Sequence, residues 1–308
     1  MLRSKTIISR NTSLSAGVSL LVLSLLTSAA HSQDLSAVDK QDLGTNKENN
    51  ARDSYAYGSS ADGSVVIGST YSDNDIYRRA YRWDQENGKV ELGTLKDDNS
   101  GRSEAWDVSA DGNAITGLAD TDYSWYYHAY RWTEDGGMQD LGTISGNDNM
   151  NSVGYGISAD GSTVVGYSDT GNSWYYHAFR WTEDGGMQDL GTLKTTEEDG
   201  YSEAYSVSAD GSKVVGYAQS DVARRAFLWD ESTGKMEDLG TLESDQDNAR
   251  ASIAYGISAD GTTVVGGANF DGGSNAFKYR AFRWTSEMGM DPLGTCEPMV
   301  LESPKRGM

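Results

Sequence analysis

Short runs of alternating apolar and polar residues recur along the chain, and residues 204–241 show the pattern in full. Residues 204–208, Ala-Tyr-Ser-Val-Ser, alternate as a half-buried strand does. Asp210 and Gly211 follow and favour a tight hairpin turn, because glycine tolerates a positive φ. Three further strand-like stretches come next, at residues 213–217, 226–229 and 236–241. The pattern predicts four short strands joined by tight turns.

The same pattern repeats at a nearly constant period. A Ser-Ala-Asp-Gly motif recurs with its aspartate at Asp62, Asp111, Asp160, Asp210 and Asp260, in steps of 49, 49, 50 and 50 residues. A tryptophan recurs at Trp83, Trp132, Trp181, Trp229 and Trp284. A Leu-Gly-Thr motif recurs with its glycine at Gly93, Gly142, Gly191, Gly240 and Gly294. A sixth Leu-Gly-Thr at residues 43–45 precedes them, so the chain consists of a leading fragment and five full units.

Four strands in each unit of about 50 residues are typical of a β-propeller blade. An isolated unit would leave an apolar face exposed, so we expect the units to pack side by side and to bury the repeated Tyr, Phe and Trp of the third strands. The sequence therefore predicts an all-β fold, a β-propeller of about five four-stranded blades. The alternatives are a β-helix, whose rungs usually repeat faster, and a ring that stays open or is completed by a partner.

The N-terminal segment has the layout of a secretory signal peptide. Arg3, Lys5 and Arg10 precede an apolar run over residues 14–30, and small residues precede a cleavage site after Ser32. An uncleaved membrane anchor is the alternative, although the run is short for a span of about 20 residues. We expect residues 1–32 to be a signal peptide, 33–298 the propeller repeats and 299–308 an irregular tail. We expect a secreted or periplasmic monomer with no further membrane span; association with the cell surface is compatible with this location.

The formal net charge of −21 narrows the range of partners. A chain this acidic repels nucleic acid, which requires a basic surface. One interpretation is that the negative charge keeps the protein soluble. The alternative is that clusters of acidic residues bind calcium weakly. These clusters lie at residues 73–75, 97–99, 197–199 and 245–248. No EF-hand spacing occurs, so we predict no cofactor beyond such weak calcium binding. The single cysteine, Cys296, cannot form an internal disulfide.

Residues 177–193 resemble a known family. His-Ala-Phe-Arg-Trp at 177–181, Gly-Gly-Met at 185–187 and Asp-Leu-Gly-Thr-Leu at 189–193 are similar to the bacterial extracellular repeats named for their His-Ala-Phe element, the HAF repeats. The Ser-Ala-Asp-Gly and Val-Val-Gly motifs within 158–166 are also similar, and the resemblance covers residues 41–296. It implies export and propeller-like repeats, and it supplies no catalytic residues. Some relatives carry such repeats as an autotransporter passenger ahead of a membrane barrel.

Two units carry extra aromatic residues just before their third strand, where a loop is expected. Exposed Trp and Tyr side chains can stack on sugar rings or bind a protein partner. The alternative is a recent duplication whose aromatic residues seal one contact between blades. The predicted ligand-binding residues are Trp125, Tyr126, Tyr127, His128, Trp174, Tyr175, Tyr176 and His177.

Two rows of basic residues flank the alanine of each third strand. One row is Arg79, His128, His177, Arg225 and Arg280. The other is Arg82, Arg131, Arg180 and Arg283, with Leu228 interrupting it. Either row could present a ring of positive charge to an anionic sugar. Because the rows recur in every unit, we favour a structural role in which each arginine pairs with the aspartate of a neighbouring turn.

The sequence lacks the signatures of known catalytic sites. It contains no His-Glu-x-x-His, no Gly-x-Ser-x-Gly, no phosphate-binding loop and no Cys/His metal set. We therefore predict a binding or surface module, not an enzyme, that recognises a glycan or a cell-surface protein. A glycan-acting hydrolase or lyase is one alternative. An autotransporter passenger remnant without its membrane barrel is the other.

Overall fold

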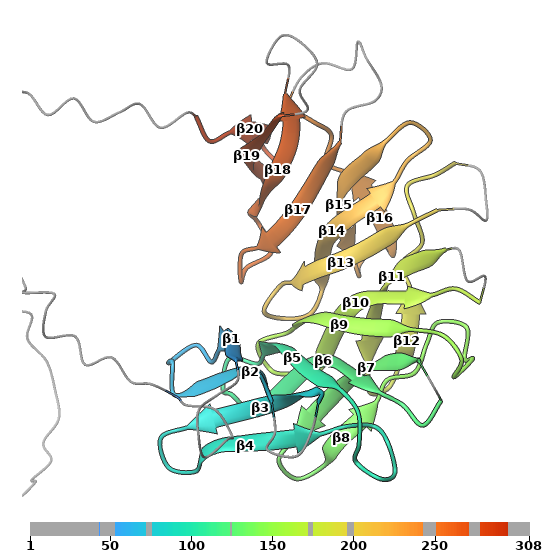
Figure 1. The fold of residues 1–308 in the computed structure, drawn as a ribbon. Coiled ribbons are helices and arrows are strands. Elements are labelled where there is room, and N and C mark those ends of the chain that lie inside the picture. The colour runs from blue at the N-terminus through green and yellow to red at the C-terminus, as the bar shows by residue number, and fades with distance from the viewer. Residues whose placement is uncertain are drawn as a thin grey trace, which may run out of the picture. The chain divides into compact units, whose positions relative to one another are not determined.

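The structure is a computed structural model that describes residue 43 and residues 53–71, 76–123, 125–171, 175–195, 200–242, 251–270 and 278–294. The regular elements of these residues are all strands, and they belong to a compact unit over residues 43–308 (Figure 1). They form five four-stranded antiparallel sheets, each in sequence order. The predicted signal peptide (1–32) and tail (299–308) lie outside the described residues.

The strands of the five sheets are regular in length. The first sheet comprises β1 (Ser54–Ser59), β2 (Val65–Tyr71), β3 (Arg78–Asp84) and β4 (Gly88–Gly93). The second comprises β5 (Ser103–Val108), β6 (Ala114–Asp120), β7 (Tyr127–Thr133) and β8 (Gly137–Asp140). The third comprises β9 (Ser152–Ile157), β10 (Thr163–Asp169), β11 (Tyr176–Thr182) and β12 (Gly186–Asp189). The fourth comprises β13 (Ser202–Val207), β14 (Lys213–Gln219), β15 (Arg224–Asp230) and β16 (Lys235–Asp238), and the fifth β17 (Ser252–Ile257), β18 (Val264–Phe270), β19 (Lys278–Thr285) and β20 (Gly289–Pro292).

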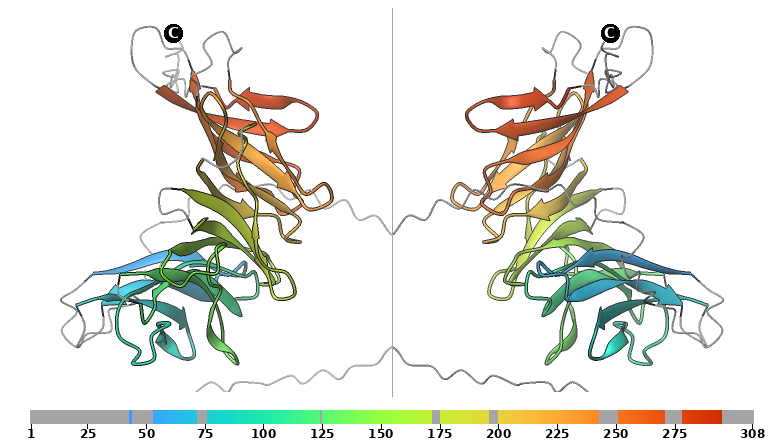
Figure 2. Two further views of the ribbon diagram at one scale, coloured as in Figure 1. Left: turned by 90° about the vertical axis from the view of Figure 1, so that its right-hand side faces the viewer. Right: turned by 90° about the vertical axis from the view of Figure 1, so that its left-hand side faces the viewer.

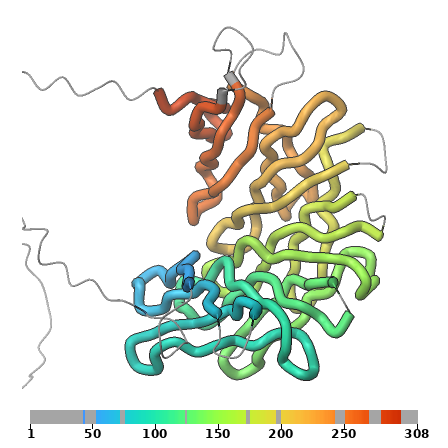
Figure 3. Tube along the Cα trace, viewed as in Figure 1, coloured from blue at the N-terminus to red at the C-terminus, as the bar shows by residue number. Residues whose placement is uncertain are grey.

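The sheets follow one another along the unit in sequence order (Figures 1, 2 and 3). Contacts between neighbouring sheets are made chiefly by the first strand of one sheet against the first three strands of the sheet before it. The first strands also contact each other in succession, from β1 through β5, β9 and β13 to β17. The first strands therefore lie along the inner edge, where the sheets converge, as in a propeller.

Each contact between sheets has its own hydrophobic core. In the contact between the third and fourth sheets, Val165 and Leu190 of one pack with Val214, Phe227 and Trp229 of the other. The other three contacts repeat this arrangement with equivalent residues. The third-strand aromatic residues Tyr81, Tyr130, Phe179, Phe227 and Phe282 are fully buried. The predicted core role of these residues is confirmed.

Hydrogen bonds repeat between sheets with the same regularity. The Ser202 hydroxyl accepts a hydrogen bond from the Ala178 backbone N–H at 2.8 Å and donates one to the Gly191 carbonyl at 2.5 Å. Ser103, Ser152 and Ser252 bridge their neighbours in the same way. Since the bridged groups are buried, each serine satisfies main-chain atoms that would otherwise lack a partner.

The arginines of the second basic row hold neighbouring sheets together. Arg131 and Arg180 donate from Nε to the carbonyl oxygens of Gly161 and Gly211, at 2.7 and 2.9 Å, in the turn of the following sheet. Arg82 does the same with Gly112 at 3.4 Å. The structural role expected from the sequence is therefore confirmed for these three residues. The partner in each case is the glycine carbonyl of the turn, where the sequence suggested the aspartate.

Candidate functional site

The first strand of each sheet contains a β-bulge with an aromatic residue at its unpaired position. In the fourth sheet Ala204 pairs with Gly216 and Ser206 with Val215, so Tyr205 is the extra residue. The other four sheets show the same shift. A bulge re-aims the side chain it carries. We call the five bulged residues the inner aromatic row: Tyr57, Trp106, Tyr155, Tyr205 and Tyr255.

The inner aromatic row runs without a break across the five sheets. Ring centroids of successive members lie 4.8, 6.4, 5.5 and 6.0 Å apart. The two end members are the most accessible, and Tyr255 is 58% exposed. Sequence reasoning did not single out these five residues as a group. The recurrence of an aromatic residue at one position of every unit was the available signal.

A second aromatic group lies at the end of the sheets where the third strands begin. We call it the aromatic rim: Tyr127, Tyr167, Tyr175, Tyr176, Tyr201 and Tyr217. The hydroxyls of Tyr127 and Tyr167 lie 3.3 Å apart, and the Tyr167 and Tyr176 rings are 5.2 Å apart. Tyr167 therefore connects predicted site residues of the second and third units, which the sequence could not show to be neighbours.

The rim continues into the fourth sheet and borders a pocket there. The Tyr176 ring lies 5.0 Å from that of Tyr201, and its hydroxyl is 3.0 Å from the Tyr217 hydroxyl. The pocket, of about 270 Å³, is lined by Tyr201, Tyr217 and residues 219–224. The Arg224 guanidinium lies 4.3 Å from the centre of the Tyr217 ring. An exposed tyrosine face and a cation held flat on a second tyrosine thus meet in one pocket.

Glu203 fixes the tyrosines that support this pocket. Its two carboxylate oxygens accept hydrogen bonds from Tyr217 at 2.7 Å and from Tyr205 at 2.8 Å. Burial, and then the hydrogen bonds with Tyr176 and Glu203, raise the pKa of Tyr217 far above its usual value. Burial and the nearby Glu203 charge also raise the pKa of Tyr205. Both phenols therefore stay protonated and act as hydrogen-bond donors.

The structure places the eight predicted site residues in different environments. Tyr127, Tyr175 and Tyr176 belong to the aromatic rim, and Tyr126 is half-buried. Trp125 is 96% exposed and lies in the turn before β7. Trp174 lies outside the described residues. Three of the predicted residues thus lie together on the rim, while Trp125 projects into solvent.

The two histidines have partners within their own sheets. His128 is buried, and its Nδ1 lies 2.9 Å from Asp140 at the end of β8. His177 makes the equivalent contact with Asp189, also at 2.9 Å. The position is occupied by Arg225 in the fourth sheet, which faces Asp238 at 4.0 Å. His128 is therefore not on the accessible surface, contrary to the expectation that it contacts a ligand.

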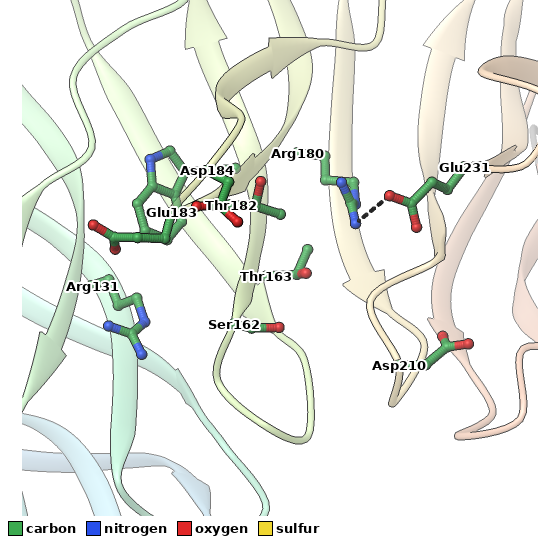
Figure 4. A pocket seen from close by; sticks show the side chains of 10 residues that line it. Arg131, Ser162, Thr163, Arg180, Thr182, Glu183, Asp184, Asp210 and Glu231 are labelled. Atoms are coloured by element: carbon green, nitrogen blue, oxygen red, sulfur yellow. Dashed lines mark ion pairs between the residues drawn. The ribbon is translucent and has the colours of Figure 1, made fainter.

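A larger, charged pocket lies at the opposite end of the sheets, beside the Ser-Ala-Asp-Gly turns (Figure 4). It has a volume of about 470 Å³ and opens where the Arg180 guanidinium faces Glu231, with N and O 3.0 Å apart. Asp210 and Arg131 line it as well. Because Arg131 and Arg180 already hold turn carbonyls, their charge serves contacts between sheets. The aromatic rim is the stronger candidate for a binding site.

The described part of the chain contains neither a cluster of metal ligands nor a membrane-spanning helix. No group of three or more His, Cys, Asp or Glu side chains is placed to hold a metal ion within the ranges given above. Of the predicted acidic clusters, residues 73–75, 197–199 and 245–248 fall outside those ranges. No helix long and apolar enough to cross a membrane occurs among the described residues.

Comparison with known proteins supports the fold. No protein-family model and no curated protein matches the chain. Among solved structures, a TolB protein from Agrobacterium tumefaciens is similar with 15% identity and a TM-score of 0.51, over 79% of this chain and 81% of that one. Prolyl oligopeptidase B from Galerina marginata has 12% identity and a TM-score of 0.51, over 79% of this chain but only 34% of that one. These likenesses show the propeller-type fold, and activity does not follow from them.

Proposed function

We propose that the chain is an exported propeller-type module that binds a glycan at the aromatic rim, without catalysis. The single observation that carries the proposal is the pocket of about 270 Å³ in which the exposed Tyr201 ring lies beside Arg224. An aromatic face offers a flat apolar surface to a sugar ring, and the guanidinium and phenol groups supply hydrogen-bond donors. The signal-like N-terminus supports export to the periplasm or beyond.

The rigidity of the rim supports binding. Tyr176, Tyr217 and Glu203 form a continuous set of hydrogen bonds behind the exposed ring. Side chains that are already ordered lose little entropy when a ligand docks, so more of the contact energy appears as affinity. The net charge of −21 on the chain disfavours nucleic acid as the ligand.

The resemblance to HAF repeats is consistent with an extracellular role, and membership of that family is part of the proposal. A surface protein could use the same rim, since exposed Tyr and Arg are common in protein interfaces. A partner protein is therefore an alternative ligand. The bound sugar is expected to leave the site unchanged, because we assign no catalytic pair to the rim.

The test is a glycan array with the purified chain and three single variants. Tyr201→Ala and Arg224→Ala should each reduce binding about tenfold or more, which is the loss of about 1.4 kcal/mol of binding energy. Tyr255→Ala is the matched control, because it removes an exposed tyrosine from the inner aromatic row. Loss of binding in Tyr255→Ala alone would place the site on that row instead.

Two further outcomes would contradict the proposal. If the chain binds no glycan on the array, the rim does not serve a sugar. If a bound polysaccharide is cut into shorter products by the chain, the module is an enzyme. Size analysis of the polysaccharide after overnight incubation distinguishes binding from cleavage.

A further inference from the structure

We infer that the fifth sheet is a docking face for the first sheet of a second copy of this chain. The inference rests on faces at the two ends of the series of sheets, and it is independent of glycan binding. Each of the first four sheets presents a face that the next sheet covers. Figure 1 shows the first and fifth sheets apart, and the described residues show no core cluster shared by them.

Two apolar residues of the fifth sheet, Val265 and Leu293, are exposed where their counterparts in other sheets are buried. Val265 is 43% exposed, whereas the equivalent Val165 and Val215 are completely buried. Leu293 is 54% exposed, whereas the equivalent leucines of the other sheets are all buried: Leu92, Leu141, Leu190 and Leu239. The fifth sheet thus has the composition of a covered face and no cover among the described residues. Such a patch marks an interaction surface.

Main-chain hydrogen bonds between the turns of neighbouring sheets form a series, and the groups at its two ends are complementary. The Ala61 N–H donates to the Ala110 carbonyl at 3.0 Å, and each turn alanine donates to the next in the same manner up to Ala209 and Ala259. Among the described residues, the series leaves the Ala259 N–H without an acceptor and the Ala61 carbonyl without a donor. A donor at one end therefore matches an acceptor at the other.

The arginine contacts between sheets form a second series, and the groups at its two ends are again complementary. Arg82, Arg131 and Arg180 each reach the glycine carbonyl in the turn of the following sheet. In the described part of the chain, Arg283 of the fifth sheet is exposed and has no following turn to reach. No described sheet precedes the first one, so the Gly63 carbonyl receives no arginine within the described ranges. Arg283 and Gly63 would form the fifth contact of the series.

The turn glycines show that the first sheet has an uncovered end. A Cβ on Gly112, Gly161 or Gly261 would overlap a side chain of the preceding sheet: Val65, Ala114 and Lys213 respectively. A Cβ on Gly63 would meet nothing within 4 Å. Thr263 occupies in the fifth sheet the position that Val65 holds in the first. The space beside Gly63 therefore fits Thr263 of another copy.

A second copy fits these ends better than the chain's own first sheet does. Four contacts with the same hydrogen bonds and cores fix the angle between neighbouring sheets. Bringing the first and fifth sheets of one chain together would require these contacts to shift, because interiors of this density deform reluctantly. A second copy can dock with no such change. The contact joins unlike faces, so it is head-to-tail and can extend.

The experiment measures mass in solution by sedimentation as the concentration of the purified chain rises. The wild-type mass should increase to that of a dimer and beyond. Val265→Glu places a charge on the exposed face, and Gly63→Asn fills the space at the other end with a residue that tolerates the positive φ of 73°. Each variant should remain a monomer. Met288→Glu, in the exposed turn of the same sheet, is the control and should associate as the wild type does.

A mixture of the two blocked variants makes the test specific. Gly63→Asn retains a usable fifth sheet, and Val265→Glu retains a usable first sheet. Together they should form a one-to-one dimer and no larger species, because both remaining ends are blocked. A wild-type chain that stays monomeric at all concentrations, or a mixture that does not dimerise, would overturn the inference. The first result would indicate closure within one chain, as the monomer expected from the sequence requires.

Discussion

The Nζ of Lys213 lies 3.3 Å from the carbonyl oxygen of Gly261, so a lysine from the second strand holds the turn of the following sheet. In the first three sheets an arginine of the third strand makes this contact. Leu228 replaces that arginine in the fourth sheet and is buried in the core between the fourth and fifth sheets. The interruption of the arginine row therefore does not interrupt the contact, because a cation from the adjacent strand takes its place.

The contact between Lys213 and Gly261 predicts the effect of replacing the lysine. Lys213→Met keeps the aliphatic stem against Gly261 but loses the donor, and it should lower the free energy of unfolding by about 0.5–1.5 kcal/mol. Denaturant unfolding measures the change. Lys235→Met is the control, since Lys235 is an exposed lysine of the same sheet. Equal stability of the two variants would show that the Lys213 contact contributes nothing.

The aspartates of the Ser-Ala-Asp-Gly turns predict a loss of stability in acid. The Ser208 hydroxyl, and then the Ser212 backbone N–H, lower the pKa of Asp210 to about 2. The pKa of Asp260 is also lowered to about 2, by Ser258 first. A carboxyl group whose pKa falls on folding stabilises the fold above its unfolded pKa of about 3.9. That stability is lost as the pH falls toward 2.

The measurement is denaturant unfolding at several pH values between 5 and 2. The wild-type free energy of unfolding should fall steadily over this range. Asp210→Asn should be less stable than the wild type at pH 5 and should lose less on acidification. Asp135→Asn, in an exposed turn, controls for the removal of one charge. Parallel pH curves for the wild type and Asp210→Asn would refute the role of the turn.

The sequence predicted the strands because burial imposes periodicity on them. The third strand was expected at residues 226–229 and is found at Arg224–Asp230, with Phe227 and Trp229 buried as predicted. The second was expected at 213–217 and is found at Lys213–Gln219. Apolar alternation and turn glycines are local signals, so they locate elements well and their ends within a few residues.

The candidate site was only partly predictable, because it depends on contacts between units. Tyr176 was identified from its extra aromatic neighbours, but its contacts with Tyr201 and Tyr217 join residues far apart in the chain. Tyr205 was not identified as part of a site, because a bulge adds one residue to the strand and reverses the direction expected from alternation. The aromatic residue recurs in every unit, but the alternation within one strand does not reveal the bulge, and a contact between units leaves no periodic trace in one sequence.

A close approach of the neighbouring backbone explains the glycine of each Val-Val-Gly motif and predicts the cost of replacing it. A Cβ on Gly266 would overlap the Ile253 carbonyl oxygen of the bulged strand, whereas one on Gly267 would make an ordinary contact at 3.4 Å with Tyr279. Gly266→Ala should therefore destabilise the fold by about 2–3 kcal/mol or more. Gly267→Ala should change stability by less than about 1 kcal/mol. Thermal unfolding of the two neighbouring variants compares them directly, and similar melting temperatures would refute the bulge argument.

Trp125 has an almost fully exposed side chain and a backbone conformation that glycine adopts more easily. Its φ is 78°, and it is 96% exposed in the turn that the Tyr126 N–H closes on the Tyr123 carbonyl. A non-glycine residue in this region costs about 1 kcal/mol or more. At 96% exposure, the indole recovers little of this cost by packing on the described residues. We therefore expect the exposed indole to contact a ligand.

Two substitutions at this position separate strain from contact. Trp125→Gly should raise the free energy of unfolding by up to about 1 kcal/mol, because it relieves the strained backbone. Trp125→Ala keeps the strain and should leave stability nearly unchanged. If the indole stacks on a sugar beside the aromatic rim, both variants should lose glycan binding to a similar extent. Binding and stability would then move in opposite directions in Trp125→Gly, which loss of folding cannot produce. Unchanged binding in both variants would restrict the site to the pocket beside Tyr201.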